Sequence, residues 1–371
     1  MEKENIKDLR KVKLEIGMYD DAGMKGVHFH NYLEDYLVKG GFMGPSIYAG
    51  LSQMEITLLR NQLRQQGKAI PATAFEKMLY AYDIMPTGPM SSKVNKFFET
   101  PNITTLFPEY ISNRVYATAM NVAKFMGFIA NTNIIKGLKY KKIYLQDTAT
   151  DRQLGETARG GEFPRTRIAL ADEDISLRKY GRILEFDYES IAETSLTTLE
   201  TVVLKRIGQQ IGIDMTDRLI YVLINGDGNS NGLESAQTVT TDSTTLINKD
   251  DIIKLMSCLP TPYQFNKFFI RTAYWRKYVS TLSDMTNPAA QKAEIGIPFP
   301  MAERWDETVL TSDLALGVDS REAVEYITTD LAILEESQKV ITKQTVETVI
   351  SIRVNFSVID QDAIGALDIE H

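Results

Sequence analysis

The sequence predicts an α+β fold, and three segments carry that prediction. Apolar residues recur every three or four positions from Leu196 to Leu223, which is the pattern of a long amphipathic helix. Apolar and polar residues alternate from Val346 to Val358, which is the pattern of a strand. Residues 162–188 combine strand propensity with a high density of charge. Because these helical and strand segments are long and no internal repeat accompanies them, the sequence favours α+β over a solenoid or propeller.

The composition is that of a globular chain with an acidic balance. Its 371 residues are 43% hydrophobic and 24% charged, with a formal net charge of −8, which argues against general disorder. An acidic chain without a Lys/Arg-rich block does not resemble a protein that grips nucleic acid with its whole surface. The single cysteine, Cys258, excludes an internal disulfide and a cysteine-based zinc site. It lies in an apolar stretch, so we expect a buried small side chain.

No segment of the sequence predicts a membrane span or an export signal. The longest apolar runs, 125–130 and 219–224, are six residues each, whereas a bilayer requires about 20. The first 13 residues are charged throughout and lack the apolar core of a signal peptide.

The first 95 residues differ in pattern from the rest. Helical candidates at 31–39, 51–66 and 72–84 are separated by glycines and prolines, and the middle one is polar. This pattern favours an arm or assembly segment over a self-sufficient core. A longer helix is predicted at 111–129, where apolar residues recur at helical spacing.

The charged segment predicts a β-hairpin. Ile168 and Leu170 alternate with polar residues, 171–174 has the composition of a turn, and Ile175 and Leu177 resume the alternation. The basic residues of the predicted shaft are Arg165, Arg167, Arg178, Lys179 and Arg182. The acidic residues of the predicted tip are Asp172, Glu173 and Asp174. Since a lone two-stranded hairpin is only marginally stable, we expect a neighbouring subunit to pack against it and these eight residues to form inter-subunit contacts.

Two glycines interrupt the predicted long helix. Gly208 and Gly212 each cost about 1 kcal/mol relative to alanine. Charged and polar neighbours exclude a membrane interpretation of their spacing. The pattern therefore predicts a close approach of another backbone or a local bend.

After the long helix, Asp227, Asn229, Asn231 and Gly232 match the first half of a calcium-loop motif. The motif requires a bidentate carboxylate at its twelfth position, where this chain has Thr238. A turn that ends the helix is the favoured interpretation.

The remaining candidate sites are weak. His28, His30 and Glu34 could place ligands together, but the only other histidine is His371; metal sites need three or four ligands, so polar decoration of the surface is favoured. No nucleophile turn or glycine-rich nucleotide motif occurs. The sequence therefore predicts no catalytic residue, no cofactor and no metal.

Aromatic residues cluster at 263–278, with lysines and arginines between them. Such a cluster could stack on bases. A packed aromatic face on a strand and helix is favoured, because the chain as a whole is acidic.

The order of these elements points to a known family. A charged loop at 160–188 is followed by a long helix (190–225), a Gly-Asp-Gly loop (225–228), a mixed region, and a C-terminal strand with an acidic turn within 352–367. The segments 275–282 and 309–317 extend the match. This order resembles the major capsid protein of tailed bacteriophages, whose fold is shared by encapsulin shells, and the resemblance covers roughly residues 100–371.

The resemblance implies a division of the chain. It comprises an N-terminal arm (1–95), the first part of a peripheral domain (96–145), an extended β-hairpin loop (146–189), a spine helix (190–227), an axial domain (228–340) and a C-terminal strand of the peripheral domain (341–371). Residues 1–95 lack the heptads of a coiled-coil scaffold, which favours a retained arm over a cleaved one.

The resemblance also implies a structural protein without enzymatic activity. It would assemble in the host cytoplasm into pentamers and hexamers of an icosahedral virion head that encloses double-stranded DNA without sequence-specific binding. Its partners would be copies of itself, a portal, and scaffolding or decoration proteins, with no membrane. The alternatives are an encapsulin-type compartment and an α+β enzyme or binding protein of unknown chemistry.

Overall fold

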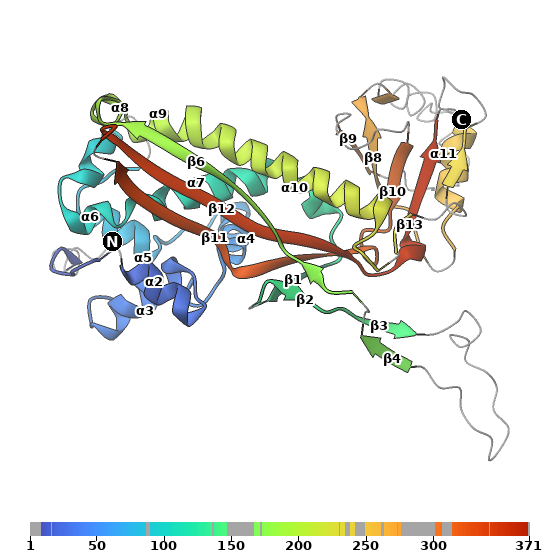
Figure 1. Cartoon of the computed structure of the whole chain (residues 1–371), viewed down its shortest axis with the longest axis horizontal. Coiled ribbons are helices and arrows are strands. Elements are labelled where there is room, and N and C mark those ends of the chain that lie inside the picture. Colours follow the sequence, from blue (N-terminus) through green and yellow to red (C-terminus); the bar gives the residue numbers. More distant parts are fainter. Residues whose placement is uncertain are drawn as a thin grey trace, which may run out of the picture. The chain divides into compact units, whose positions relative to one another are not determined.

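The computed structural model divides into two compact units, each built from three chain segments (Figure 1). The first unit comprises Met1–Ala123, Arg178–Met215 and Thr328–Val354, and the second comprises Lys124–Leu177, Thr216–Ile327 and Asn355–His371. The residues that the structure describes are 9–15, 17–86, 90–122, 124–135, 137–146, 167–170, 173–229, 231–233, 238–241, 249–260, 263–272, 274–275, 301–305, 314–340 and 342–369. Helices and strands both occur in each unit, which confirms the α+β class. No helix within the described residues is long and apolar enough to cross a membrane.

Four N-terminal helices form a packed layer of the first unit. They are α2 (Gly17–Lys25), α3 (Phe29–Lys39), α4 (Gln53–Gln65) and α5 (Ala74–Ala81). Helices α4 and α5 each begin with a capping box, in which Ser52 pairs with Glu55 and Thr73 with Glu76. Leu33 of α3 and Met78 of α5 are fully buried. These short helices thus bury apolar side chains, and the role of residues 1–95 as an arm stays a prediction.

The central helices of the first unit follow the predicted pattern with shifted ends. They are η1 (Val94–Phe98), α6 (Pro101–Thr104), α7 (Phe107–Val122), α8 (Tyr188–Glu193), α9 (Leu196–Thr198), the π-helical stretch η3 (Leu199–Leu204) and α10 (Lys205–Asn225), which continues into the second unit. The predicted long helix is confirmed, although the six residues from Leu199 to Leu204 within it are π-helical rather than α-helical. The predicted helix at 111–129 begins earlier, at Phe107, and gives way to the 3₁₀ segment η2 (Lys124–Gly127).

Helix α7 lies against α10 at Gly208. A Cβ atom at this position would lie 2.6 Å from the Val115 carbonyl oxygen and 2.7 Å from the Thr118 Cβ atom. Both distances are far below van der Waals contact, so the two backbones can approach this closely only when residue 208 has no side chain.

We therefore expect Gly208→Ala to destabilise the protein by about 1–3 kcal/mol, because the steric cost of overpacking exceeds the gain in helix propensity of about 1 kcal/mol. Gly23→Ala is the matched control: Gly23 is also helical, and a Cβ atom there would meet nothing within 4 Å. It should stabilise the protein by about 0.5–1 kcal/mol. Denaturant unfolding measures both changes, and a neutral or stabilising Gly208→Ala would contradict the close approach.

A four-stranded sheet has the order β1 (Asn131–Ile135), β11 (Val324–Val340), β12 (Thr345–Val358) and β6 (Arg178–Asp187). Strand β12 confirms the strand predicted at 346–358. Strand β11 is not predicted, because its second half is rich in leucine, glutamate and lysine, which favour helix in isolation. Pairing with β12 overrides that local preference.

The predicted hairpin is wrong in its strand pairing. Strand β4 (Arg167–Leu170) pairs antiparallel with β3 (Ile143–Gln146), whereas β5 (Ile175–Ser176) pairs with β2 (Lys139–Tyr140). Strand β6 instead pairs with β12 over ten residue pairs. This long ladder also buries Leu184 and lets Phe186 pack edge-on against Phe107. A short hairpin across 171–174 offers neither the ladder nor the burial.

The second unit contains a five-stranded sheet, ordered β7 (Thr238–Thr240), β13 (Ile364–Asp368), β10 (Leu314–Val318), β8 (Lys267–Arg271) and β9 (Met301–Trp305). Helix α11 (Lys249–Ser257) contributes Leu255 to a core cluster that includes Phe265, Phe268 and Tyr274. The predicted packed aromatic face is therefore confirmed for these residues. Cys258 is half-buried against the same cluster, and burial raises the pKa of its thiol to about 11.

Candidate functional site

The histidines predicted to decorate the surface are buried. His28 and His30 are 7% and 3% exposed and Glu34 is 1% exposed, so the surface interpretation is wrong. His28 is the N-cap of α3, where its Nδ1 atom accepts a hydrogen bond from the His30 backbone N–H. One Glu34 carboxylate oxygen accepts a hydrogen bond from the Ser46 backbone N–H. Their place at the start of a packed helix, next to α7, removes them from solvent.

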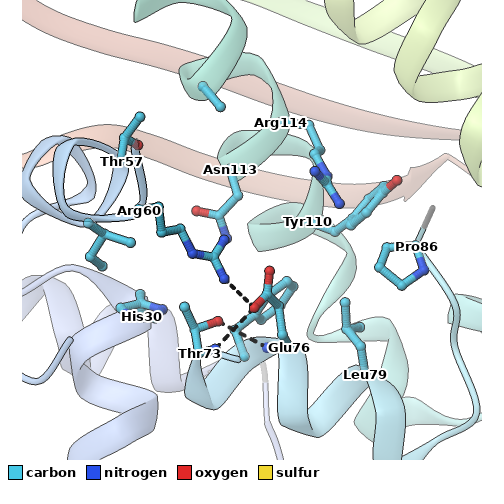
Figure 2. A pocket seen from close by; sticks show the side chains of 13 residues that line it. His30, Thr57, Arg60, Thr73, Glu76, Leu79, Pro86, Tyr110, Asn113 and Arg114 are labelled. Carbon is cyan, nitrogen blue, oxygen red and sulfur yellow. Dashed lines mark hydrogen bonds and ion pairs between the residues drawn. The ribbon is translucent and has the colours of Figure 1, made fainter. Parts of the chain in front are cut away.

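Of these three residues, His30 borders a cavity of about 100 Å³ among α3, α4, α5 and α7, which has both polar and apolar lining residues (Figure 2). Arg60 of α4 forms an ion pair with Glu76 of α5 at the cavity wall. The Glu76 carboxylate also accepts a hydrogen bond from the Thr73 backbone N–H as part of the α5 capping box. The cavity is also lined by His30 of α3 and by Tyr110 and Asn113 of α7.

Three buried polar atoms around this cavity have no hydrogen-bond partner within the described residues. They are His30 Nε2, Arg60 Nε and the Tyr110 hydroxyl. No group of three or more His, Cys, Asp or Glu side chains in the described part of the chain is arranged to hold a metal ion. The ion pair at the wall is internally neutral, so water or a small uncharged polar solute suits this cavity best.

Glu109 of α7 lies close to His28 and was not predicted from the sequence. Its Oε1 atom accepts a hydrogen bond from the Asn113 side-chain amide and lies 3.8 Å from His28 Nδ1. Burial raises the pKa of Glu109 to about 7, against opposing contributions from His30 and Asn113. Burial lowers the pKa of His28 to about 4. The sequence does carry a signal for Glu109: it is a carboxylate in a mainly apolar helix, two residues from both Phe107 and Ile111.

The two pKa shifts make the free energy of unfolding change with pH in opposite directions. For Glu109, the raised pKa favours the neutral acid in the folded state, so its contribution is full below its ordinary value of 4.5 and is lost as pH rises through 7. For His28, the lowered pKa favours the neutral ring, so its contribution is full above 6.5 and is lost as pH falls through 4. Between about pH 4.5 and 6.5 these two contributions change in opposite directions and largely offset each other.

Single substitutions should expose each slope. We expect Glu109→Gln to lose stability on acidification from pH 6.5 to 4, and His28→Asn, which keeps an N-cap acceptor, to lose stability as pH rises from 4.5 to 7. Each loss should reach about 3 kcal/mol, from about 2.5 pKa units at 1.36 kcal/mol per unit. Urea unfolding at a series of pH values measures both. Parallel pH profiles for the two variants would contradict the assignment.

The loop that resembles a calcium site is a hydrogen-bonded turn. Asp227 Oδ1 accepts from the Asn229 backbone and side chain, and Oδ2 accepts from the Ser357 hydroxyl and the Val358 N–H. Burial opposes ionisation of Asp227, but these hydrogen bonds outweigh it and lower its pKa. Thr238, at the twelfth position, lies in β7, where it pairs with Ala366. The carboxylate is thus satisfied by the protein itself.

We expect EDTA to leave the melting temperature unchanged, because protein donors already occupy the Asp227 carboxylate. Asp227→Ala should lower stability by about 1–3 kcal/mol with or without calcium, since it orphans buried donors at Ser357 and Val358. Differential scanning fluorimetry with added calcium and with EDTA tests both points. An EDTA-sensitive shift that Asp227→Ala abolishes would show that the loop binds a cation.

The structure separates the predicted inter-subunit residues. Arg165 and Asp172 lie outside the described residues, and of Arg167 only its place in β4 is described. The Glu173 backbone N–H donates to Asn229 Oδ1 at 3.0 Å, and the Asp174 carboxylate lies 3.6 Å from Lys139 Nζ. Arg178, Lys179 and Arg182 are exposed on β6. Glu173 and Asp174 therefore contact their own chain rather than forming a hairpin tip. For Gly212 the close approach remains a prediction.

Comparisons with known proteins give similarities in structure only. No protein-family model and no curated protein matches the sequence. Among solved structures, the chain is similar to the capsid of a native GTA particle (14% identity, TM-score 0.45, 67% of this chain and 91% of that chain). It is also similar to the satellite phage P4 procapsid (12% identity, TM-score 0.46, 69% of this chain and 90% of that chain). A third similarity is to the SrpI encapsulin complex of Synechococcus elongatus PCC 7942 (14% identity, TM-score 0.43, 65% of this chain and 85% of that chain).

Proposed function

We propose that this chain is a structural shell protein, the major capsid protein of a tailed phage, which assembles into pentamers and hexamers around double-stranded DNA. The observation that carries the proposal is the β3–β4 ladder. Within the part of the chain that the structure describes, these strands form a two-stranded sheet with four residue pairs, from Ile143–Leu170 to Gln146–Arg167. A two-stranded ribbon of this length is marginally stable by itself. A neighbouring subunit that packs on this ribbon would stabilise it.

The placement of the basic residues supports the same proposal. Arg178, Lys179 and Arg182 are exposed on β6, which is the edge of its four-stranded sheet. Within the described residues, no ion pair to a carboxylate is formed by any of the three. An exposed charge contributes little to the stability of one subunit, whereas charge complementarity sets register and partner choice between subunits. A contact repeated at every subunit of a closed shell makes such small terms count together.

The proposal is tested by the size of what the purified chain forms. We expect closed megadalton shells in sedimentation and electron microscopy. Ala169→Pro, which removes a backbone donor from β4 opposite Tyr144, should abolish shells while circular dichroism and thermal melting stay close to native.

Leu316→Pro is the matched control. It lies in β10, an inner strand of the five-stranded sheet, and should unfold its unit. A chain that stays monomeric under all assembly conditions would contradict the proposal, as would normal shells from Ala169→Pro. Shells that contain a cargo protein and no DNA would identify an encapsulin-type compartment instead.

A further inference from the structure

The β6 edge of the four-stranded sheet has no backbone partner within the described residues. Strand β6 is last in the sheet order, and its ten residues pair with β12 on one side only. About half of its backbone N–H and C=O groups therefore point to the other side. Open edges of this length are sites where another strand can add.

The residues of β6 divide by alternation into two faces. Leu184 is buried and Phe186 packs against Phe107, so these two even-numbered residues face inward, whereas the even-numbered Arg178 and Arg182 are exposed. The odd-numbered residues form the outer face, with Lys179 near one end, Ile183 at the centre and Asp187 at the other end. Ile183 is 61% exposed, an unusual position for a large apolar side chain in mid-strand.

The charges of the outer face are separated along the strand. At the first end, Lys179 stands directly opposite Arg353 of β12, a like-charge cross-strand pair that is unfavourable within one subunit. Towards the other end, Glu185 contacts Lys343 at 3.6 Å. Asp187 makes no capping bond to α8 through its side chain. One end of the edge is thus basic and the other acidic.

We propose that the β6 edge binds the β6 edge of a second copy of this chain, antiparallel and about a two-fold axis through Ile183. This arrangement places Ile183 opposite itself and Lys179 of each copy opposite Asp187 of the other. The Asp187 carboxylate of the second copy offsets the repulsion between Lys179 and Arg353, and the contact covers the exposed Ile183 side chain. Only a self-complementary patch satisfies a two-fold contact, and a strand that is basic at one end and acidic at the other has that property when it pairs antiparallel.

Charges on an edge strand can also serve to prevent pairing. Charged residues that prevent edge pairing act by repulsion. The antiparallel arrangement proposed here instead brings side chains of opposite charge together. A single pair of ten-residue strands buries less than the roughly 1,200–2,000 Å² of a stable complex. The self-association should therefore be weak and should weaken further with added salt.

Charge exchange tests the pairing in the full-length chain. By sedimentation equilibrium, Lys179→Glu and Asp187→Lys alone should each weaken dimerisation about tenfold, because two ion pairs per dimer become repulsive. The double variant Lys179→Glu with Asp187→Lys should restore the native affinity. Single variants that associate as well as or better than the native chain would overturn the proposal, as would a double variant that stays weak.

Disulfide trapping provides a test that does not depend on affinity. In a Cys258→Ala background, Ile183→Cys should form a crosslinked dimer on oxidation, whereas Met24→Cys, at an 80% exposed position on α2, should not. Lys179→Cys should crosslink to a chain that carries Asp187→Cys and not to itself. Trapping at the control position to the same extent would overturn the pairing.

Both tests are made on the unassembled fraction as well as on any shells. Failure to form shells therefore bears on the proposed function alone, and failure to trap or dimerise bears on the β6 contact alone.

Discussion

Ten residue pairs join β6 to β12, from Asp187 opposite Thr345 to Arg178 opposite Val354. Because this ladder engages one side of β6, strand β4 is left to pair with β3 in a separate two-stranded sheet. The ladder also fixes which face of β6 turns inward, since Leu184 and Phe186 pack on the helical side. The outward face and the free edge follow from that choice. The segments proposed to meet other subunits are therefore consequences of one strand pairing.

Elements with a strong local period could be predicted from the sequence. The apolar stripe from Leu196 to Leu223 specifies a helix, and the alternation from Val346 to Val358 specifies a strand, because each pattern reports one face of its own element. Gly208 was recognisable as a helix-interrupting residue for a similar reason. Its partner, α7, was not, since the contact joins segments about 90 residues apart.

Pairing partners and burial of polar groups could not be predicted in the same way. The choice of β12 over β4 as the partner of β6 depends on the length of the ladder and on burial, neither of which is local. His28 and His30 looked like surface residues because polar side chains in a breaker-rich region usually are. Their burial depends on α7, whose Glu109 lies 81 positions further along the chain. The histidines and this carboxylate are tolerated there because each can be neutral, which avoids most of the cost of a buried charge.

The assignment of β6 to the sheet of β12 is the claim on which the other conclusions depend, and amide hydrogen exchange in the unassembled subunit measures it most directly. The pairing predicts that β6 amides facing β12 are as strongly protected as those of β12, while β3 and β4 exchange much faster as a marginal two-stranded sheet. Similar fast exchange along β4 and β6, with the β12 amides that face β6 unprotected, would contradict the pairing.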